Sequence, residues 1–352
     1  MLSKLGLPIS IQEDIQLQNI DSENLARVVA VHKERFVIRN TADTFNAEIT
    51  GNLRYSAISN EDFPAVGDWV EMTAFDENTA IITSLLKRVS SIQRRAVGKY
   101  GEAQMIAANV DYCFIVMALD QNFNLNRLDR YVSICEGGAV KPIVLLSKSD
   151  LVETELAEDQ KQAVLERYSQ IDVMHLSALT EDGLQELSER LEEKQTYCFI
   201  GSSGVGKSTI VNHLLGSEAL KTSALSESNQ KGRHTTSHRE LFVLPNGSII
   251  IDTPGMRELG MADNSEGIDV TFSQISDLSE SCRFSDCTHT SEKGCAILDA
   301  LEEGEISEDE YDNYQKLQRE QEHYAESQKD KRKKGKQLSK MIKQVKSNHR
   351  KY

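Results

Sequence analysis

The chain has 352 residues, of which 39% are hydrophobic and 27% are charged, a composition typical of a globular protein with two or three domains. Its longest apolar runs, such as Tyr112–Leu119, are far shorter than the roughly twenty residues of a membrane span. The first ten residues lack the apolar core of a signal peptide. These features favour a cytoplasmic protein without a membrane-spanning segment.

The net charge of −15 is unevenly spread along the chain. Residues 331–352 contain ten Lys and Arg and no acid, which leaves −25 on residues 1–330. An acidic body with a basic end suggests a nucleic-acid contact at that end. A solvated terminus without fixed structure explains the same charge run equally well, and both interpretations stay open.

The first 95 residues fall into two parts. Residues 1–22 are expected to form an extension without fixed structure. Residues 23–95 contain short β-type runs separated by turn residues, which predicts a small all-β domain. A five-strand OB-like barrel fits this length best, and an SH3-like barrel is the alternative. The five runs are Ala26–His32, Arg35–Arg39, Phe45–Thr50, Gly67–Phe75 and Ala80–Leu86.

The region from 104 to 262 alternates between apolar runs and amphipathic stretches. Such alternation predicts an α/β domain with a parallel sheet covered by helices on both faces. A ligand of this domain is expected at the carboxyl ends of the strands. The main apolar runs are Tyr112–Leu119, Pro142–Ser147, Asp172–Ala178, Gln195–Gly201 and Gly247–Thr253.

A glycine-rich loop, Gly201–Ser208, follows one of these apolar runs and opens a helical pattern. Its spacing is that of a P-loop, whose backbone N–H groups surround phosphate oxygens. Lys207 is expected to reach the β- and γ-phosphates, and the Ser208 hydroxyl to bind Mg²⁺. The predicted nucleotide-binding residues of this loop are Gly201, Ser202, Ser203, Gly204, Val205, Gly206, Lys207, Ser208 and Thr209.

Downstream, Asp252 ends an apolar run and Gly255 follows three residues later. An acid at this place holds Mg²⁺ in P-loop enzymes, and Gly255 could turn its amide toward a γ-phosphate. The polar stretch Ser223–Arg239 is too long for a simple connection. We expect it to act as a switch that is ordered when Thr235 or Thr236 joins Ser208 in binding Mg²⁺.

Two further elements point to guanine. Ser147-Lys148-Ser149-Asp150 resembles the guanine-specificity motif N-K-x-D, in which the Asp carboxylate accepts hydrogen bonds from guanine N1–H and its amine, with Ser147 in the place of the usual Asn. Ser177-Ala178 resembles the short element whose backbone contacts guanine O6. The motifs run in a rotated order, with the guanine elements before the P-loop, which indicates a circularly permuted P-loop GTPase domain that binds GTP or GDP with Mg²⁺.

A cysteine cluster follows this domain. Cys282, Cys287, His289 and Cys295 lie within fourteen residues, and three thiolates with one imidazole suit tetrahedral Zn²⁺. One structural zinc ion per chain is therefore expected in a domain spanning residues 263–300. Residues 301–352 are expected to form a helical, basic C-terminal tail.

Together these motifs resemble the ribosome small-subunit-dependent GTPase A family of bacteria over about residues 25–300. The resemblance implies a GTPase that acts late in maturation of the small (30S) ribosomal subunit, is stimulated by it, and contacts 16S rRNA through its OB and zinc domains. We expect a monomer. The sequences that carry the likeness, besides those above, are Ala107–Asp111, Asn126–Tyr131, Gly232–Thr236, Asp252–Glu258 and Cys282–His289.

Catalysis requires an oriented water and charge compensation. The residue after Gly255 is Met256, whose side chain can neither accept a proton nor orient a water molecule. Slow intrinsic turnover is therefore expected. His234 is a candidate for the missing group, with a solvated loop histidine as the alternative. The predicted catalytic residues are Lys207, Asp252, Gly255, His234, Thr235 and Thr236.

Two other functions fit the sequence less well. One is a non-enzymatic RNA-binding assembly protein that uses GTP only as a ligand, and the other is a P-loop ATPase. OB barrels bind single strands with basic and aromatic side chains. The candidates here are Arg54, Tyr55, Trp69, Arg94 and Arg95, although Trp69 is expected to pack in the core.

Overall fold

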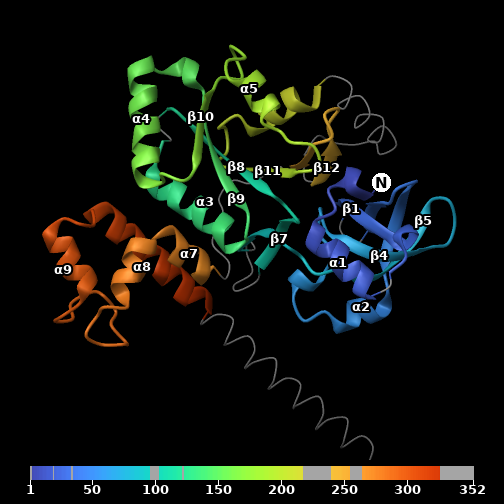
Figure 1. The fold of residues 1–352 in the computed structure, drawn as a ribbon, viewed down its shortest axis with the longest axis horizontal. Coiled ribbons are helices and arrows are strands. Elements are labelled where there is room, and N and C mark those ends of the chain that lie inside the picture. The colour runs from blue at the N-terminus through green and yellow to red at the C-terminus, as the bar shows by residue number, and fades with distance from the viewer. Residues whose placement is uncertain are drawn as a thin grey trace, which may run out of the picture. The chain divides into compact units, whose positions relative to one another are not determined.

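The protein is seen here as a computed structural model that describes residues 2–18, 20–32, 35–95, 103–120, 123–216, 239–253 and 264–325. The chain forms two compact units (Figure 1). The first comprises Met1–Gln93 and Met105–Leu259, and the second comprises Arg94–Gln104 and Gly260–Tyr352.

The first unit begins with a closed five-strand barrel. Strand β1 pairs with β2 and β4, β2 with β3, and β5 with β3 and β4, so the strands form a ring. Only the β3–β5 pair is parallel among these pairings. This is the Greek-key order expected of an OB-like barrel, which excludes the SH3-like alternative. The strands are β1 (Leu25–His32), β2 (Arg35–Arg39), β3 (Thr44–Ile49), β4 (Trp69–Ala74) and β5 (Thr79–Leu85).

The barrel core follows from period-two patterning. In β3 every second side chain is buried, because successive side chains of a strand point to opposite faces. The buried side chains include Val28, Phe36, Ile38 and Ile82. Helix α2 (Gly51–Ser56) follows β3, and the Thr50 hydroxyl caps its start by accepting the N–H of Leu53.

The expectation that residues 1–22 lack fixed structure is wrong. Residues Leu2–Leu5 form a 3-10 turn and Ile9–Gln18 form helix α1. Leu5 and Ile11 are buried in a cluster with Trp69, which is fully buried as expected. This segment therefore covers an apolar end of the barrel, and burying those side chains stabilises it against the entropy of an extended chain.

The rest of the first unit is a mostly parallel sheet with the order β10-β9-β8-β11-β13-β12. Strand β11 comes late in the sequence yet lies between β8 and β13, which is the spatial mark of the permutation. All neighbouring pairs are parallel except β12–β13. The strands are β8 (Tyr112–Ala118), β9 (Lys141–Ser147), β10 (Asp172–Leu176), β11 (Thr196–Ile200), β12 (Glu240–Val243) and β13 (Ile249–Asp252).

Helices pack on this sheet, as Figure 1 shows. Helix α3 (Leu125–Gly137) contacts β8 and β9, and α4 (Thr154–Arg167) contacts β10. Helix α5 (Leu184–Glu189) and the helix over residues 207–216 share one apolar cluster with the strands. The alternation of buried strands and amphipathic helices confirms the predicted α/β class.

The barrel and the parallel sheet are joined within the first unit. Strand β1 pairs with β12 at Ala30 and Glu240. The buried side chain of Arg27, on β1, donates hydrogen bonds to the carbonyls of Gly67 and Asn109 and to the Thr196 hydroxyl, at 3.1, 2.9 and 3.1 Å. A separate two-strand sheet is formed by β6 (Ser91–Arg95) and β7 (Ala103–Ala108).

The described part of the second unit is mainly helical. It contains α7 (Ser265–Thr271), α8 (Ser273–Ser279), α9 (Ala296–Glu303) and a helix over residues 308–325. Tyr314 and Leu317 of the last helix are buried, and the Tyr314 ring meets Phe272 edge-on with 5.6 Å between the ring centres. None of the helices in the described ranges is long and apolar enough to cross a membrane.

Candidate functional site

The carboxyl ends of the parallel strands bring the predicted motifs to one edge of the sheet. Strands β8, β9 and β10 end in register, with Ala118 opposite Ser147 and Ser147 opposite Leu176. Strand β11 leads into the glycine-rich loop at Gly201, and β13 ends at Asp252. Segments that begin near residues 147, 177, 201 and 252 therefore emerge side by side.

The glycine-rich loop has the backbone that its sequence requires. Gly201, Gly204 and Gly206 have φ values of +144°, +81° and +98°, which L side chains rarely adopt. A Cβ on Gly201 would lie 2.3 Å from the carbonyl oxygen of Val116, whereas Gly204 and Gly206 face open space. The loop is thus pressed against β8 at its start and open where a phosphate group could enter.

Lys207 is the first residue of the helix over residues 207–216, and its side chain folds back onto the glycine-rich loop. Its ammonium group donates to the carbonyls of Gly201 and Ser202 at 2.7 and 2.6 Å. Burial lowers the pKa of Lys207 to about 8, and the carboxylate of Asp252 opposes that shift. Burial likewise raises the pKa of Asp252, which the lysine opposes. A cation and an acid therefore lie close enough to influence each other and are both partly buried.

Ser147 connects the first guanine element to the glycine-rich loop. Its hydroxyl is buried and lies 2.7 Å from the carbonyl oxygen of Val205 and 3.2 Å from that of Met117. Lys148 has a left-handed φ of +60° and pairs with Asp120 at 3.2 Å. The strand end of β9 is thereby fixed to the loop that follows β11.

Asp150 and Ser177 connect the two guanine elements. The Ser177 hydroxyl donates to the Asp150 carboxylate at 2.5 Å. It also accepts the N–H groups of Leu179 and Thr180 at 3.2 and 3.1 Å. Asp150 itself is exposed, so its carboxylate is oriented by a neighbour and still accessible to a ligand.

The remaining predicted site residues fall into two groups. Ser203, Ser208 and Thr209 are exposed at the glycine-rich loop and the start of its helix, and Ser149 and Ala178 are half-buried at their strand ends. Outside the described residues lie His234, Thr235, Thr236 and Gly255.

Helix α3 adds contacts that the motif analysis did not identify. Arg127 donates to the Ser202 hydroxyl at 3.2 Å, and the Tyr131 hydroxyl lies 3.4 Å from the same oxygen. The Asn124 side chain caps this helix by accepting the N–H of Arg127. The only sequence signal was the run Asn126–Tyr131, which carried the family likeness but no role.

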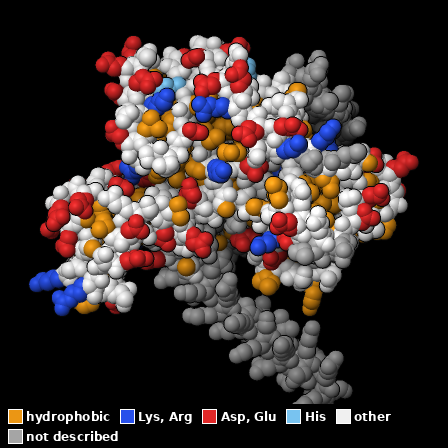
Figure 2. Space-filling model, viewed as in Figure 1, with side chains coloured by type: hydrophobic (Ala, Val, Ile, Leu, Met, Phe, Trp, Pro, Cys, Tyr) orange, Lys and Arg blue, Asp and Glu red, His pale blue; other side chains and the backbone are white. Residues whose placement is uncertain are grey.

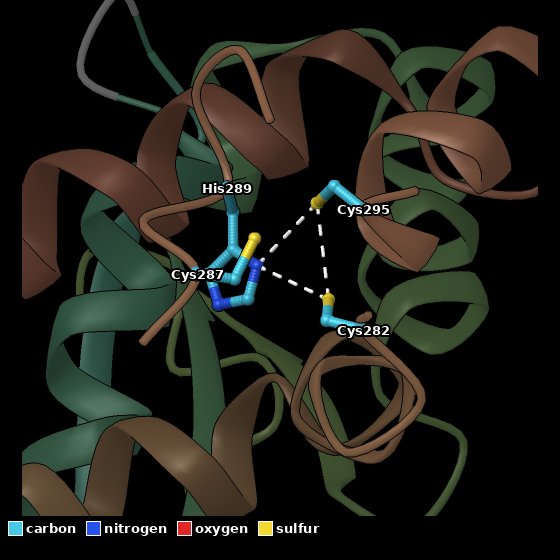
Figure 3. A group of neighbouring side chains, drawn as sticks. All are labelled: Cys282, Cys287, His289 and Cys295. Carbon is cyan, nitrogen blue, oxygen red and sulfur yellow. Dashed lines mark hydrogen bonds between the residues drawn. The ribbon is translucent and has the colours of Figure 1, made fainter. Parts of the chain in front are cut away.

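A second cluster holds the four predicted zinc ligands (Figure 3). The ligand atoms of Cys282, Cys287, His289 and Cys295 all lie within 4.8 Å of one another. The Cys282 and Cys295 sulfurs are 3.9 Å apart, and each lies 3.5 Å from His289 Nδ1. Tetrahedral zinc with bonds of about 2.3 Å to sulfur and about 2.0 Å to nitrogen separates its ligands by about 3.8 and about 3.5 Å, so the cluster fits one zinc ion.

Neighbouring groups hold the zinc-binding loop in shape. The Glu292 carboxylate accepts the N–H groups of Thr288, Thr290 and Ser291 at 2.9 to 3.0 Å. The Tyr311 hydroxyl donates to the carbonyl of His289 at 2.5 Å. Burial lowers the pKa of His289, which favours the neutral imidazole that binds metals. With four protein ligands the zinc would be structural, because no coordination position is left for a substrate.

A permuted sheet that brings a P-loop, a strand-ending acid and the N-K-x-D-like element with Asp150 to one edge defines a circularly permuted P-loop GTPase. A family model described as RsgA GTPase matches residues 85–262, and a model described as 50S ribosome-binding GTPase matches residues 196–333. The chain belongs to the RsgA GTPase family. It is accordingly an enzyme that hydrolyses GTP with Mg²⁺.

Individual proteins agree with this assignment. The chain is 41% identical over 308 residues to Small ribosomal subunit biogenesis GTPase RsgA 2 of Lactiplantibacillus plantarum, which covers 87% of this chain and 85% of that protein. It is 36% identical over 313 residues to Small ribosomal subunit biogenesis GTPase RsgA 1 of Bacteroides thetaiotaomicron, covering 88% and 86%.

Solved structures share the fold. The crystal structure of YjeQ from Thermotoga maritima matches with a TM-score of 0.62 at 24% identity, over 85% of this chain and 98% of that one. The structure of YloQ, described as a circularly permuted GTPase, matches with a TM-score of 0.59 at 27% identity, over 85% and 94%. The predicted permuted fold is thus confirmed.

Proposed function

We propose that the sheet edge described above binds GTP and hydrolyses it, with the predicted residues in their predicted roles. Lys207 and the backbone of the glycine-rich loop would hold the phosphates. Ser208 and Asp252 would hold Mg²⁺, which neutralises charge on the phosphates. Asp150 and Ala178 would read the base. The observation that carries this proposal is the hydrogen bond from Ser147 to Val205, because it joins the base-reading strand end to the phosphate-binding loop.

The chain's own groups explain part of the chemistry. The glycine-rich loop supplies fixed N–H groups, and Lys207 adds a partly buried cation. Fixed dipoles and charges stabilise the transferring phosphoryl group more strongly at a partly buried site than in bulk water. His234, Thr235, Thr236 and Gly255 stay proposals from the sequence.

A substrate exchange tests the base-reading role of Asp150. An aspartate accepts from guanine N1–H and the amine, whereas xanthine has a carbonyl in the place of that amine. Asp150→Asn should therefore lose GTP affinity by at least about tenfold, since a hydrogen bond to a charged group is worth about 1.5–3 kcal/mol, and should gain affinity for xanthosine triphosphate. Equilibrium displacement of a fluorescent nucleotide measures both. An unchanged preference for GTP over xanthosine triphosphate would remove Asp150 from the base site.

We further propose that the small ribosomal subunit is the partner of this GTPase and that the protein acts in the cytoplasm as a monomer. The support comes from relatives named as small ribosomal subunit biogenesis GTPases, which cover most of this chain. The proposed domains are residues 1–22, 23–95, 104–262, 263–300 and 301–352.

A contact with 16S rRNA would need a local surface, because acidic side chains are spread over the face drawn in Figure 2. The barrel offers one at α2 and just after it, where Tyr55, next to Arg54 in the helix, is 92% exposed and Ile58, which follows the helix, is 97% exposed. Exposed aromatic rings stack on unpaired bases. Trp69 is buried and has no such role, and Arg94 donates to the Gln104 side chain at 3.1 Å.

Phosphate release with and without purified small subunits tests the partner. We expect at least about tenfold stimulation by small subunits and none by large subunits. Lys207→Ala should abolish release in both conditions. If Lys207→Ala still supported subunit maturation, the protein would be a non-enzymatic assembly factor with nucleotide as a ligand only.

A further inference from the structure

Ser147 stands where guanine-specificity motifs usually carry Asn, and its surroundings show what the exchange does. The side chain is only 2% exposed. Two carbonyl oxygens face its hydroxyl, that of Val205 at 2.7 Å and that of Met117 at 3.2 Å. A carbonyl can only accept, and a hydroxyl has one proton. That proton is therefore committed to the protein.

The Ser147 hydroxyl proton matters because the two edges of guanine need different partners. N1–H and the amine are donors on one edge, whereas O6 and N7 are acceptors on the other. An Asn amide has two N–H donors, so it could serve the glycine-rich loop with one and N7 with the other. A serine that serves the loop has no donor left.

We propose that this GTPase reads guanine through Asp150 and Ala178 alone and makes no hydrogen bond to N7 from position 147. Ser147 is then a specificity-determining residue that keeps the anchor to Val205 and makes the site indifferent to N7. This inference rests on the proposed nucleotide site.

Asp150 and Ser177, on the N1 and amine edge of the base, are arranged so that Asp150 can distinguish guanine without help from position 147. Ser177 orients the Asp150 carboxylate through a 2.5 Å hydrogen bond and is itself held by the N–H groups of Leu179 and Thr180. A carboxylate oxygen has a second lone-pair direction besides the one that accepts from Ser177. Asp150 is thus fixed and still able to accept from the base.

Two altered nucleotides separate the two edges. In 7-deaza-GDP a C–H replaces N7, and in IDP the amine is missing. We would measure dissociation constants of GDP, 7-deaza-GDP and IDP for the full chain with Mg²⁺. We expect 7-deaza-GDP to bind within about twofold of GDP, and IDP at least about tenfold more weakly, as for a lost hydrogen bond to a charged acceptor.

Ser147→Asn supplies the missing donor. It should tighten GDP binding by about two- to tenfold, the worth of one neutral hydrogen bond, and leave 7-deaza-GDP unchanged. Wild-type protein that binds 7-deaza-GDP tenfold more weakly than GDP would overturn the inference. A failure to bind any of the three nucleotides would instead overturn the proposed site.

Ser147→Ala tests the inference even if the larger Ser147→Asn substitution disturbs folding. Because the hydroxyl serves the loop and not the base, GDP and 7-deaza-GDP should weaken together and keep their wild-type ratio. A ratio that changes in Ser147→Ala would show that the hydroxyl does contact N7, and the inference would fall.

Discussion

Lys207 is held as a partly buried ammonium, and this makes nucleotide binding depend on pH. Burial lowers its pKa to about 8, while bound phosphates would raise it again. Binding should therefore take up a proton above pH 8, so affinity is greatest below pH 8 and falls by up to about tenfold per pH unit above it. GDP dissociation constants between pH 7.5 and 8.5 measure this, a range in which the phosphates are already ionised and guanine N1–H is still protonated.

Lys207→Arg is the matched control for that dependence. A guanidinium stays protonated over the whole range, so the variant should lose the slope even if it binds GDP more weakly at every pH. Equal slopes in the two proteins would assign the titration to another group.

At the same scale, the geometry of the glycine-rich loop was predictable because its signal is local in sequence. Gly201, Lys207 and Ser208 lie within one loop, and their spacing predicts it. The hydrogen bond of Ser147 was not predictable, because its partner Val205 lies 58 residues away. Arg127 was missed for the same reason, since its partner Ser202 is 75 residues distant.

At the scale of elements, Gly67 fixes how the barrel meets β7. Its φ is +94°, and a Cβ would lie 2.0 Å from the carbonyl oxygen of Ala108. Gly67→Ala should lower the free energy of unfolding by more than about 3 kcal/mol, because backbone strain adds to a clash that only main-chain movement relieves. Denaturant titration of the full chain measures this loss.

Gly216→Ala controls for positive φ without a clash. Its φ is +65° and no atom lies within 4 Å of the added Cβ, so the cost should stay at about 1–2 kcal/mol. Similar losses for both variants would show that the approach to Ala108 relaxes freely.

The strands were predictable from their patterns, and the N-terminal segment was not. Alternating residues predict β3, and continuous apolar runs predict β8, β9 and β11. In residues 1–22 apolar side chains are as frequent as in the rest of the chain, but they follow neither one helical nor one strand period, so local periodicity gives no signal. Leu5 and Ile11 are ordered by tertiary packing around Trp69, which no local pattern encodes.

For the whole molecule, the proposed nucleotide site and the zinc cluster belong to different units. The proposed nucleotide site lies in the first unit, and all four zinc ligands lie in the second. The cysteine spacing predicted the zinc cluster, but the supporting carboxylate of Glu292 had no sequence signal. Its hydrogen bonds depend on the folded course of the loop between Thr288 and Ser291.

This division predicts that zinc loss and nucleotide binding are separable. Structural zinc contributes about 10–16 kcal/mol to the folding of small zinc modules, so Cys282→Ser should lose the metal and unfold residues around the cluster. The first unit has its own core and should keep GDP affinity within about twofold. Zinc content by mass spectrometry, limited proteolysis and GDP titration on the same preparation measure these outcomes.

Phe284→Ala is the matched control, because Phe284 is a half-exposed neighbour that donates no ligand atom. This variant should retain about one zinc per chain. Loss of GDP binding in Cys282→Ser but not in Phe284→Ala would show that the nucleotide site needs the zinc-bound second unit.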